Sequence, residues 1–212
     1  MHTGRYYLWC METRTTRNPE HTRSVLLEAA FKEIYENGFQ AASLERILSN
    51  TNLTKGALYH HFPNKRALGI AVIREIITEN IVAKNVAPLE DTDDPIPMMT
   101  KFIEHNSQAP AWATMQYGCP LNNLIQEMSP LDDEFRHHLQ QVQFIWHKAI
   151  SDALERGQAK GNVRTDVDCE EVAMFIVAAV EGCIGTAKNL QSREAYSSCM
   201  NQLKRYVENL AA

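Results

Sequence analysis

The sequence predicts an all-α protein in which a small N-terminal unit of three helices precedes a larger helical domain. Three observations support this fold class. Apolar residues recur at helical spacing through most of the 212 residues, and residues typical of helix N-caps precede several of these stretches. No Asn-Gly or Asp-Gly pair joins two alternating runs, as a β-hairpin would require. We expect nine helices without internal repeats.

The first helix is predicted to begin at Pro19, because Asn18 is a good N-cap and Glu20 places a negative charge in the first turn. Asn37 and Gly38 resemble a hairpin turn, but they follow a helical stripe. Gly38 is therefore expected to end the helix with a positive φ. The stripe that faces the core consists of Leu27, Ala30, Phe31 and Ile34.

Two short helices and one long helix follow. Ser43 and Thr54 are expected to cap the two short helices. Pro63 ends the second one, because proline disfavours continuation of the helix, and a long helix is predicted from about Lys65 to Val86. The predicted ranges are 44–50, 55–61 and 65–86.

An acidic loop with two prolines, at residues 89–97, separates the long helix from the rest of the chain. Asp168 and Ser192 are predicted to cap the last two helices. The five helices predicted beyond the loop span residues 96–108, 119–127, 131–158, 168–189 and 193–210.

These elements divide the chain into four parts. We expect Met1 to Cys10 to be a disordered leader, with Met11 as an alternative start. The predicted parts are a leader or basic arm at 1–17, the three-helix unit at 18–64, a connecting helix at 65–87 and the larger domain at 88–212.

The charges are distributed unevenly along the chain. The net charge is −5, from 21 Lys and Arg against 26 Asp and Glu. Through Arg66 there are 9 basic and 6 acidic residues, whereas from Ala67 onward there are 12 and 20. The composition excludes a uniformly basic nucleic-acid coat protein and a highly charged disordered chain. A surface that faces a polyanion is expected near the N-terminus.

The cysteines and the apolar runs indicate where the protein works. The five cysteines are odd in number and lack C-x-x-C spacing, so we expect neither a disulfide scaffold nor a zinc site, and a reducing cytoplasm as the location. No apolar run approaches the length of a membrane span, about 20 residues. His137 and His138 are adjacent on a helix and cannot both face one metal ion, and we expect no metal or cofactor.

The residues from Ser43 to Lys65 predict a helix-turn-helix, whose second helix enters the major groove of DNA. At helical spacing Leu58 and Phe62 face inward, and two small residues begin the outward face of the second helix, so its backbone can approach base edges closely. The outward residues are Gly56, Ala57, Tyr59 and His60, flanked by Lys55 and His61. The alternative is a helical hairpin that caps a larger bundle with a polar rim.

One family shares these motifs. Gly38-Phe39, Ser43-Leu44 and the run KGALYHHF from Lys55 to Phe62, followed by Asn64-Lys65, resemble the TetR family of bacterial transcriptional repressors. The chain differs from the usual family pattern in the turn, where Thr51 and Asn52 replace a small residue and a glycine. Since asparagine tolerates the left-handed conformation, the turn is expected to form and the change to affect operator choice.

The resemblance implies roles for single residues of this chain. Lys55, Gly56 and Ala57 would face base edges, and Tyr59, His60 and His61 would contact mainly phosphates. Ser43 and Thr54 would bring caps and hydroxyls to phosphates, and Lys65 would anchor the N-terminus of the next helix to the DNA backbone. Arg14, Arg17 and Arg23 form either a basic arm toward the minor groove or an ordinary solvated terminus.

The larger domain carries candidate residues for a small-molecule site. A ligand pocket is usually apolar with a few polar groups, so we expect a mostly apolar effector. The predicted lining residues are Phe102, His105, Tyr117, Glu127, Phe144, His147 and Phe175, with Trp112 as a further aromatic residue. The alternative for each aromatic residue is ordinary packing in the core.

Two other hypotheses remain open for the larger domain. Cys119 stands at a helix N-terminus, which lowers the pKa of a thiol, so it is a candidate redox or electrophile sensor, or else a buried structural thiol. No acid–base pair, nucleophile set or metal cluster is recognisable, so we do not expect an enzyme. A helical interaction module without a DNA role is the remaining alternative.

A homodimer is predicted from the helix over residues 168–189. Its apolar surface is wide enough to need two partners, and Gly182 and Gly185 allow close approach of another helix. The predicted interface consists of Ile176, Ala179, Cys183, Ala187, Leu203, Tyr206 and Leu210. The family resemblance implies a four-helix bundle formed by the last two helices of two chains.

Together these predictions describe a ligand-responsive, sequence-specific repressor that a small molecule releases from a palindromic double-stranded operator. The helix over residues 65–86 is the long element between the two domains, so we expect a bound effector to act through it. A tilt of this helix would change the separation of the two recognition helices across the dimer.

Overall fold

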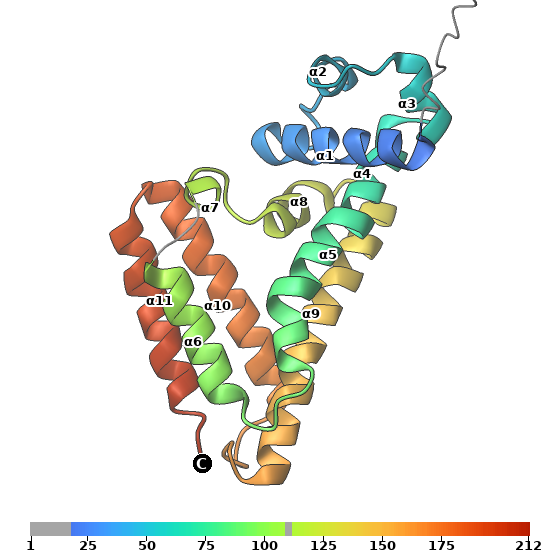
Figure 1. The fold of residues 1–212 in the computed structure, drawn as a ribbon. Helices are drawn as coiled ribbons and strands as arrows, with labels where there is room; N and C mark the ends of the chain where they lie inside the picture. The colour runs from blue at the N-terminus through green and yellow to red at the C-terminus, as the bar shows by residue number, and fades with distance from the viewer. Residues whose placement is uncertain (1–17, 109–111) are drawn as a thin grey trace, which may run out of the picture.

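The structure is a computed structural model that describes residues 18–108 and 112–212. Figure 1 shows a head of three helices above a larger helical domain. Within the described residues there is no strand, and the only β-bridge joins Val163 to Ala211. All nine predicted segments are helical, and no described helix is long and apolar enough to cross a membrane. The predicted leader, with Arg14 and Arg17, lies outside the described residues.

The head consists of α1 (Pro19–Asn37), α2 (Leu44–Ser49) and α3 (Lys55–His61). Each helix is capped as the sequence predicted, because a side-chain oxygen of Asn18, Ser43 or Thr54 accepts backbone N–H groups in the first turn. Gly38 ends α1 with a φ of 80°. The residues that bury the three helices against one another are Leu26, Leu27, Ala30, Ile47, Leu58 and Phe62.

A long helical element joins the head to the larger domain, as predicted for residues 65–86. It comprises α4 (Lys65–Ala71) and α5 (Thr78–Ile81), and a π-helical stretch follows each of them, at Val72–Ile77 and Val82–Val86. The backbone remains helical across these joins, and Figure 1 shows one continuous ribbon beside α9. A short 3₁₀ turn at Ala87–Leu89 ends it.

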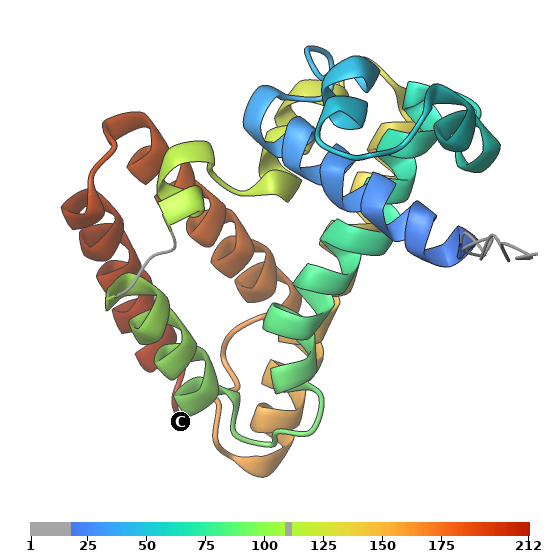
Figure 2. The same ribbon diagram turned by 45° about the horizontal axis from the view of Figure 1, so that its top comes forward.

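The described part of the larger domain contains six helices. Five match the predicted segments to within two residues at either end, and α7 is additional, formed between Pro110 and Gly118 where the sequence predicted a break. In Figures 1 and 2, α9 and α10 diverge toward the head, and α8 bridges the open end. The helices are α6 (Pro95–Gln108), α7 (Trp112–Tyr117), α8 (Pro120–Met128), α9 (Asp133–Lys160), α10 (Cys169–Leu190) and α11 (Arg193–Glu208).

A disulfide between Cys183 and Cys199 joins α10 to α11, with 5.5 Å between the two Cα atoms. The sequence predicted no disulfide scaffold from its scattered cysteines, and this single disulfide was not anticipated. It forms because the turn between the antiparallel helices brings together two residues 16 positions apart. Among the described cysteines, Cys119 and Cys169 are free.

Candidate functional site

The outer face of α3 has the amphipathic register that the sequence predicted. Leu58 is fully buried under the helix, whereas Tyr59 on the opposite side is 52% exposed. Lys55, Gly56 and His60 are also exposed, and Ala57 and His61 are half-buried at the edges of this face. The predicted base-facing and phosphate-facing residues of α3 therefore form one continuous outward surface.

Gly56 leaves the first turn of α3 open. A Cβ atom built on Gly56 would meet only Thr54 Oγ1, at 3.8 Å, so the backbone here can approach another molecule closely. Beside it, Lys55 Nζ lies 3.5 Å from Glu45 Oε1, and both side chains are mostly exposed. Exposed ion pairs of this kind contribute little to stability, so Lys55 can leave Glu45 for a phosphate or a base edge with a small loss of free energy.

The hydroxyls of Ser43 and Thr54 act as caps inside the head. Ser43 Oγ accepts a hydrogen bond from Glu45 N at 3.2 Å, and Thr54 Oγ1 accepts one from Ala57 N at 3.2 Å. A hydroxyl that accepts in this way still has its own proton to donate. Both residues can therefore keep the helix ends in place and donate to a phosphate at the same time.

Lys65 and Arg23 are engaged with their own chain. Lys65 Nζ donates to Gln40 O at 3.0 Å and lies 4.8 Å from the centre of the Phe39 ring, and partial burial lowers its pKa. Arg23 pairs with Glu75, and its guanidinium lies over the Phe62 ring. The structure thus places Arg23 in a bond between α1 and the long helix, not in a basic arm. DNA contact by Lys65 stays a prediction.

His60 and His61 lie side by side at the end of α3, with 5.2 Å between the ring centres. Burial lowers the pKa of His61, and the positive charges of His60 and Arg23 lower it further. The neutral form of His61 is therefore favoured at neutral pH. It can donate one hydrogen bond to a phosphate without carrying a charge.

Three contacts attach the head and the start of α4 to the larger domain. The Glu127 carboxylate, near the end of α8, accepts hydrogen bonds from Phe39 N at 2.9 Å and Gln40 N at 2.8 Å. The Tyr35 hydroxyl donates to Gly118 O at 2.7 Å. Arg66 pairs with the first residues of α9 through Asp132, at 2.7 Å, and Glu134. The last turns of α1 and the turn that follows it are thus bonded to the two ends of the α8 segment.

A tight apolar contact lies beneath these polar ones. The rings of Phe39 and Phe135 pack with their centres 4.5 Å apart. Gly69 passes beside them, and a Cβ atom there would lie 2.5 Å from the Phe39 ring and 2.8 Å from the Phe135 ring. Glycine is therefore required where α4 crosses between head and body, because any side chain would push these rings apart.

The structure does not bring the seven predicted effector residues together. Phe102 and His105 line a cavity of about 330 Å³ between α6, α9, α10 and the end of the long helix. Tyr117 and Glu127 line a separate groove between α1, α8 and α10. Phe144, which is 65% exposed, and His147 lie at a depression between α9 and α10.

Phe175 is absent from these cavities. It is 51% exposed and packs against Tyr206 of α11 with ring centres 4.7 Å apart. The side chain of Trp112 lies outside the described residues. The cavity beside Phe102 is instead completed by residues that sequence reasoning did not select, among them Trp146, Ile150 and Ile176.

The surroundings of Cys119 disfavour its thiolate form. It lies at the start of α8, but burial raises its pKa, and the nearby Glu181 carboxylate raises it further. Two backbone N–H groups at the helix start lower the pKa, but their effect is smaller than that of burial. The expected thiolate is therefore disfavoured, because desolvation outweighs the helix N-terminus.

The predicted dimer face lies largely inside the chain. Ile176, Cys183, Ala187, Leu203 and Leu210 are buried between α10, α11 and their neighbours, and only Ala179 and Tyr206 are half-exposed. The prediction selected α10 residues that are packed inside the chain, where α10 contacts α9 and α11. The exposed face of α10 carries Met174, Phe175, Ala178, Gly182 and Gly185.

The chain matches two family descriptions that together cover most of it. Residues 26–72 match "Bacterial regulatory proteins, tetR family", and residues 95–203, more than half of the chain, match "Tetracyclin repressor-like, C-terminal domain". The chain belongs to the TetR family. The three-helix head and the larger domain described above are the two parts of a TetR-family regulator, which is a DNA-binding transcriptional regulator and not an enzyme.

Relatives and solved structures agree with this assignment. The transcriptional regulator AcuR of Cereibacter sphaeroides is 29% identical over 77% of this chain and 74% of its own length. The repressor DhaR of a Mycobacterium species is 28% identical over 81% of this chain and 85% of its own. The crystal structure of a TetR regulatory protein from Rhodobacter sphaeroides superposes with a TM-score of 0.76 at 26% identity, covering 87% of this chain and 98% of that chain. TetR-family regulators bind operators as dimers and respond to small-molecule effectors.

Proposed function

We propose that this TetR-family regulator is a homodimeric repressor that binds a palindromic operator through α3 and is released by a small molecule. The observation that carries the proposal is the junction between head and body. Because Glu127 fastens the head to α8 and Arg66 fastens the start of α4 to α9, a shift in the cavity-bearing domain would move the DNA-binding surface. The two regions are thus mechanically connected as a ligand-controlled regulator requires.

The DNA contacts follow from the outward surface of α3. Lys55, Gly56 and Ala57 occupy its first turn, where the open backbone fits against base edges in the major groove. Tyr59, His60 and His61 lie one turn later, where hydroxyl and imidazole donors reach phosphates. Ser43 and Thr54 add their hydroxyl protons at the helix starts.

The exposed face of α10 supports the dimer. Phe175 and Met174 are large apolar side chains in contact with solvent, and Ala178 follows one turn later. A Cβ atom built on Gly182 or Gly185 would meet nothing within 4 Å, so a second helix can approach the backbone there. A second copy that covers this face would form a bundle of α10 and α11 from two chains. Its two-fold axis would require a palindromic operator.

The release mechanism depends on the spacing of the two α3 helices. Half-sites on B-form DNA are about 34–36 Å apart for each helical turn. Both α4 and α8 link the cavity-bearing domain to the head, so a bound effector that separates α6 from α9 would tilt the head. A change of a few ångströms removes contacts from both half-sites at once. The effector shifts the equilibrium only by its differential affinity for the two states, and about 2.7 kcal/mol corresponds to a hundredfold change in DNA affinity.

The experiment uses operators selected from a random-sequence DNA library by the wild-type protein. We expect inverted repeats and two chains for each site by sedimentation. Lys55→Ala should weaken binding by about tenfold or more and reduce the slope of affinity against salt by about one. The double variant Tyr59→Phe with His60→Ala should also bind more weakly while its circular dichroism spectrum is unchanged.

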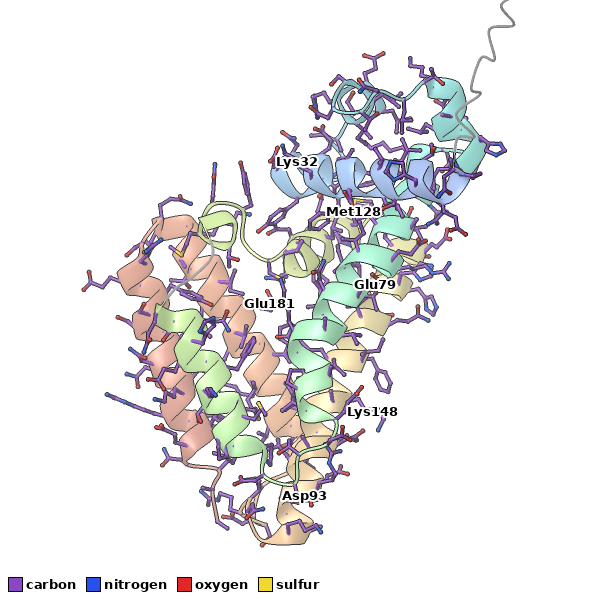
Figure 3. The ribbon with its side chains drawn as sticks, in the orientation of Figure 1. Lys32, Glu79, Asp93, Met128, Lys148 and Glu181 are labelled. Atoms are coloured by element: carbon purple, nitrogen blue, oxygen red, sulfur yellow. A yellow bond between two sulfur atoms is a disulfide. The ribbon has the colours of Figure 1, made fainter. Side chains whose placement is uncertain are left out.

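Lys32→Ala provides a matched control, because Lys32 is an exposed lysine on α1, away from α3. Figure 3 shows its position in the head. Lys32→Ala changes the net charge by the same amount as Lys55→Ala, and its operator affinity should stay within about twofold of the wild-type value. Unchanged operator affinity in both α3 variants, or selected sites bound by a single chain, would refute the proposal.

A further inference from the structure

The cavity between α6, α9 and α10 has a cationic edge. Fourteen described residues line it, and ten of them are apolar. The four polar residues are Lys84, Asn85, Lys101 and His105, and none of the described lining residues is acidic. Lys84 and Asn85 come from the end of the long helix, whereas Lys101 and His105 lie one turn apart on α6.

The two lysines at this edge are unpaired within the described residues. Other lysines of the larger domain bond to acids: Lys148 to Asp152 at 2.8 Å and Lys204 to Glu104 at 3.1 Å. Glu104 is the acid nearest to Lys101 in the sequence, and its pairing with Lys204 leaves Lys101 without a counter-ion. Both Lys84 and Lys101 line the cavity and are exposed, so they lie at its solvent-accessible edge.

The inside of the cavity fits the apolar part of a small molecule. Its volume of about 330 Å³ lies in the range of ligand pockets. Trp146, Ile150 and Ile176 form its inner wall and are buried. Phe102 and Met98 stand at its edge and are partly exposed to solvent, so a ligand that covered them would gain hydrophobic free energy.

We propose that this cavity binds a small apolar carboxylate, with its hydrocarbon part against Trp146 and its anionic group held by Lys101 and Lys84. The inference rests on the proposed function, because it names the chemical class of the effector for that same cavity.

The arrangement selects between ligands by charge. An ammonium group would lie beside two unpaired lysines and be repelled, and a hydroxyl would gain no charge-assisted hydrogen bond. Glu181 is the buried acid of α10 and the natural partner for a cationic ligand, but it is not among the residues that line this cavity. The lining therefore favours an anion over a cation of the same size.

The test compares three eight-carbon probes, octanoate, octan-1-ol and octylamine, at concentrations below micelle formation. Binding is followed by the fluorescence of Trp146, in a variant in which Trp9 and Trp112 are replaced by Phe, and by calorimetry of the unmodified chain. Octanoate should bind at least about tenfold more tightly than octanol, because a hydrogen bond between two charged groups is stronger than one to a neutral hydroxyl. Octylamine should bind most weakly, and the preference for octanoate should decrease with salt.

Single lysine variants locate the anion. Lys101→Gln and Lys84→Gln should each weaken octanoate binding by about fivefold or more and leave octanol binding unchanged. Lys101→Arg should keep most of the affinity. Lys148→Gln is the matched control, because this lysine points away from the cavity on the outside of α9 and its removal changes the net charge equally (Figure 3).

The outcomes separate this inference from the proposed function. Octanol or octylamine binding as tightly as octanoate, or lysine variants that leave octanoate affinity unchanged, would overturn the inference, whereas operator binding by α3 would still support the repressor. Octanoate binding with the expected lysine dependence but without release of the selected operator would support the inference and refute the proposed ligand response.

Discussion

Two buried glutamates distinguish the head from the larger domain. Glu33 in α1 is 5% exposed, and its carboxylate accepts hydrogen bonds from Arg46 Nε at 2.6 Å, Asn37 Nδ2 at 3.2 Å and Ser43 N at 3.2 Å. Glu181 in α10 is 9% exposed, and among the described residues neither of its carboxylate oxygens accepts a hydrogen bond from a nitrogen or oxygen donor; the Cys119 thiol is its polar neighbour. Figure 3 shows it on the side of α10 that faces α5 and α9.

This difference corresponds to what each region has to do. The head must present one fixed surface to DNA, and the bonds of Glu33 fix α1 against α2 and the turn between them. The larger domain contains a cavity and an unsatisfied buried acid, and both leave its packing open to change by a ligand or a proton. The head is therefore held by local hydrogen bonds, whereas the stability of the larger domain is expected to change with pH and with a bound ligand.

The largest effect is expected from Glu181. Burial raises its pKa to about 7, above the ordinary value of 4.5. The folded state therefore binds this proton more tightly than the unfolded state, and the group contributes stability at low pH that is lost as pH rises from about 4.5 to 7. The loss amounts to at most about 3 kcal/mol. Glu181→Gln should thus be more stable than the wild type at pH 8 and similar to it at pH 5, measured by urea unfolding.

Glu171→Gln is the control for this comparison, because Glu171 is an exposed acid in the first turn of the same helix. It should not reproduce the pH-dependent gain. If Glu181→Gln were less stable than the wild type at pH 8, the carboxylate would have a favourable partner in solution, and the contrast between head and body would fail.

The second effect concerns the head. Glu33→Ala removes the acceptor for Arg46 and for Ser43 N, and it leaves buried donors unpaired. We expect a loss of about 2 kcal/mol, because breaking a buried pair is costly but Arg46 is half-exposed to solvent. The loss should be independent of pH between 6 and 8 and should be accompanied by weaker operator binding.

The exposed Glu36 lies one turn further along α1 and supplies the control. Glu36→Ala should change the free energy of unfolding by less than about 0.5 kcal/mol. Equal effects of Glu33→Ala and Glu36→Ala would show that the bonds of Glu33 do not fix the head.

The head was predictable from the sequence because local rules govern it. Asn18, Ser43 and Thr54 cap their helices as expected, and the small α3 has one inward residue, Leu58, in its middle turn. In such a short helix, identifying the one buried residue also identifies the residues on the opposite, exposed face. Lys65 was harder to place, because its long side chain reaches either DNA or the Gln40 carbonyl from the same backbone position.

The larger domain was less predictable because its helices are apolar on more than one side. Phe144 and Trp146 lie two positions apart on α9, so they face nearly opposite directions, and only packing with α6 and α10 places Trp146 at the cavity. Phe175 and Ile176 on α10 present the same problem: the sequence analysis selected Ile176 for the dimer, but Phe175 is the exposed residue. Periodicity identifies such a helix but does not assign its faces.

The smallest effect on stability, and the sharpest test of how the two regions communicate, is expected from Glu127. In the wild type each carboxylate oxygen of Glu127 accepts from one of the two N–H groups, of Phe39 and of Gln40. Glu127→Gln keeps one of these acceptors and places an amide NH₂ against the second N–H group, which should lower the free energy of unfolding by about 1 kcal/mol. The turn after α1 should then open more readily, so that hydrogen exchange at Phe39 and Gln40 accelerates by about fivefold.

Exchange in α10 should not change. A Gln126→Ala variant is the control, because Gln126 is exposed on α8 beside Glu127, and it should leave exchange at Phe39 and Gln40 unchanged. Unchanged exchange at Phe39 and Gln40 would mean that α8 does not hold the head, and coupling would then pass through α4, whose Gly69 fits between Phe39 and Phe135.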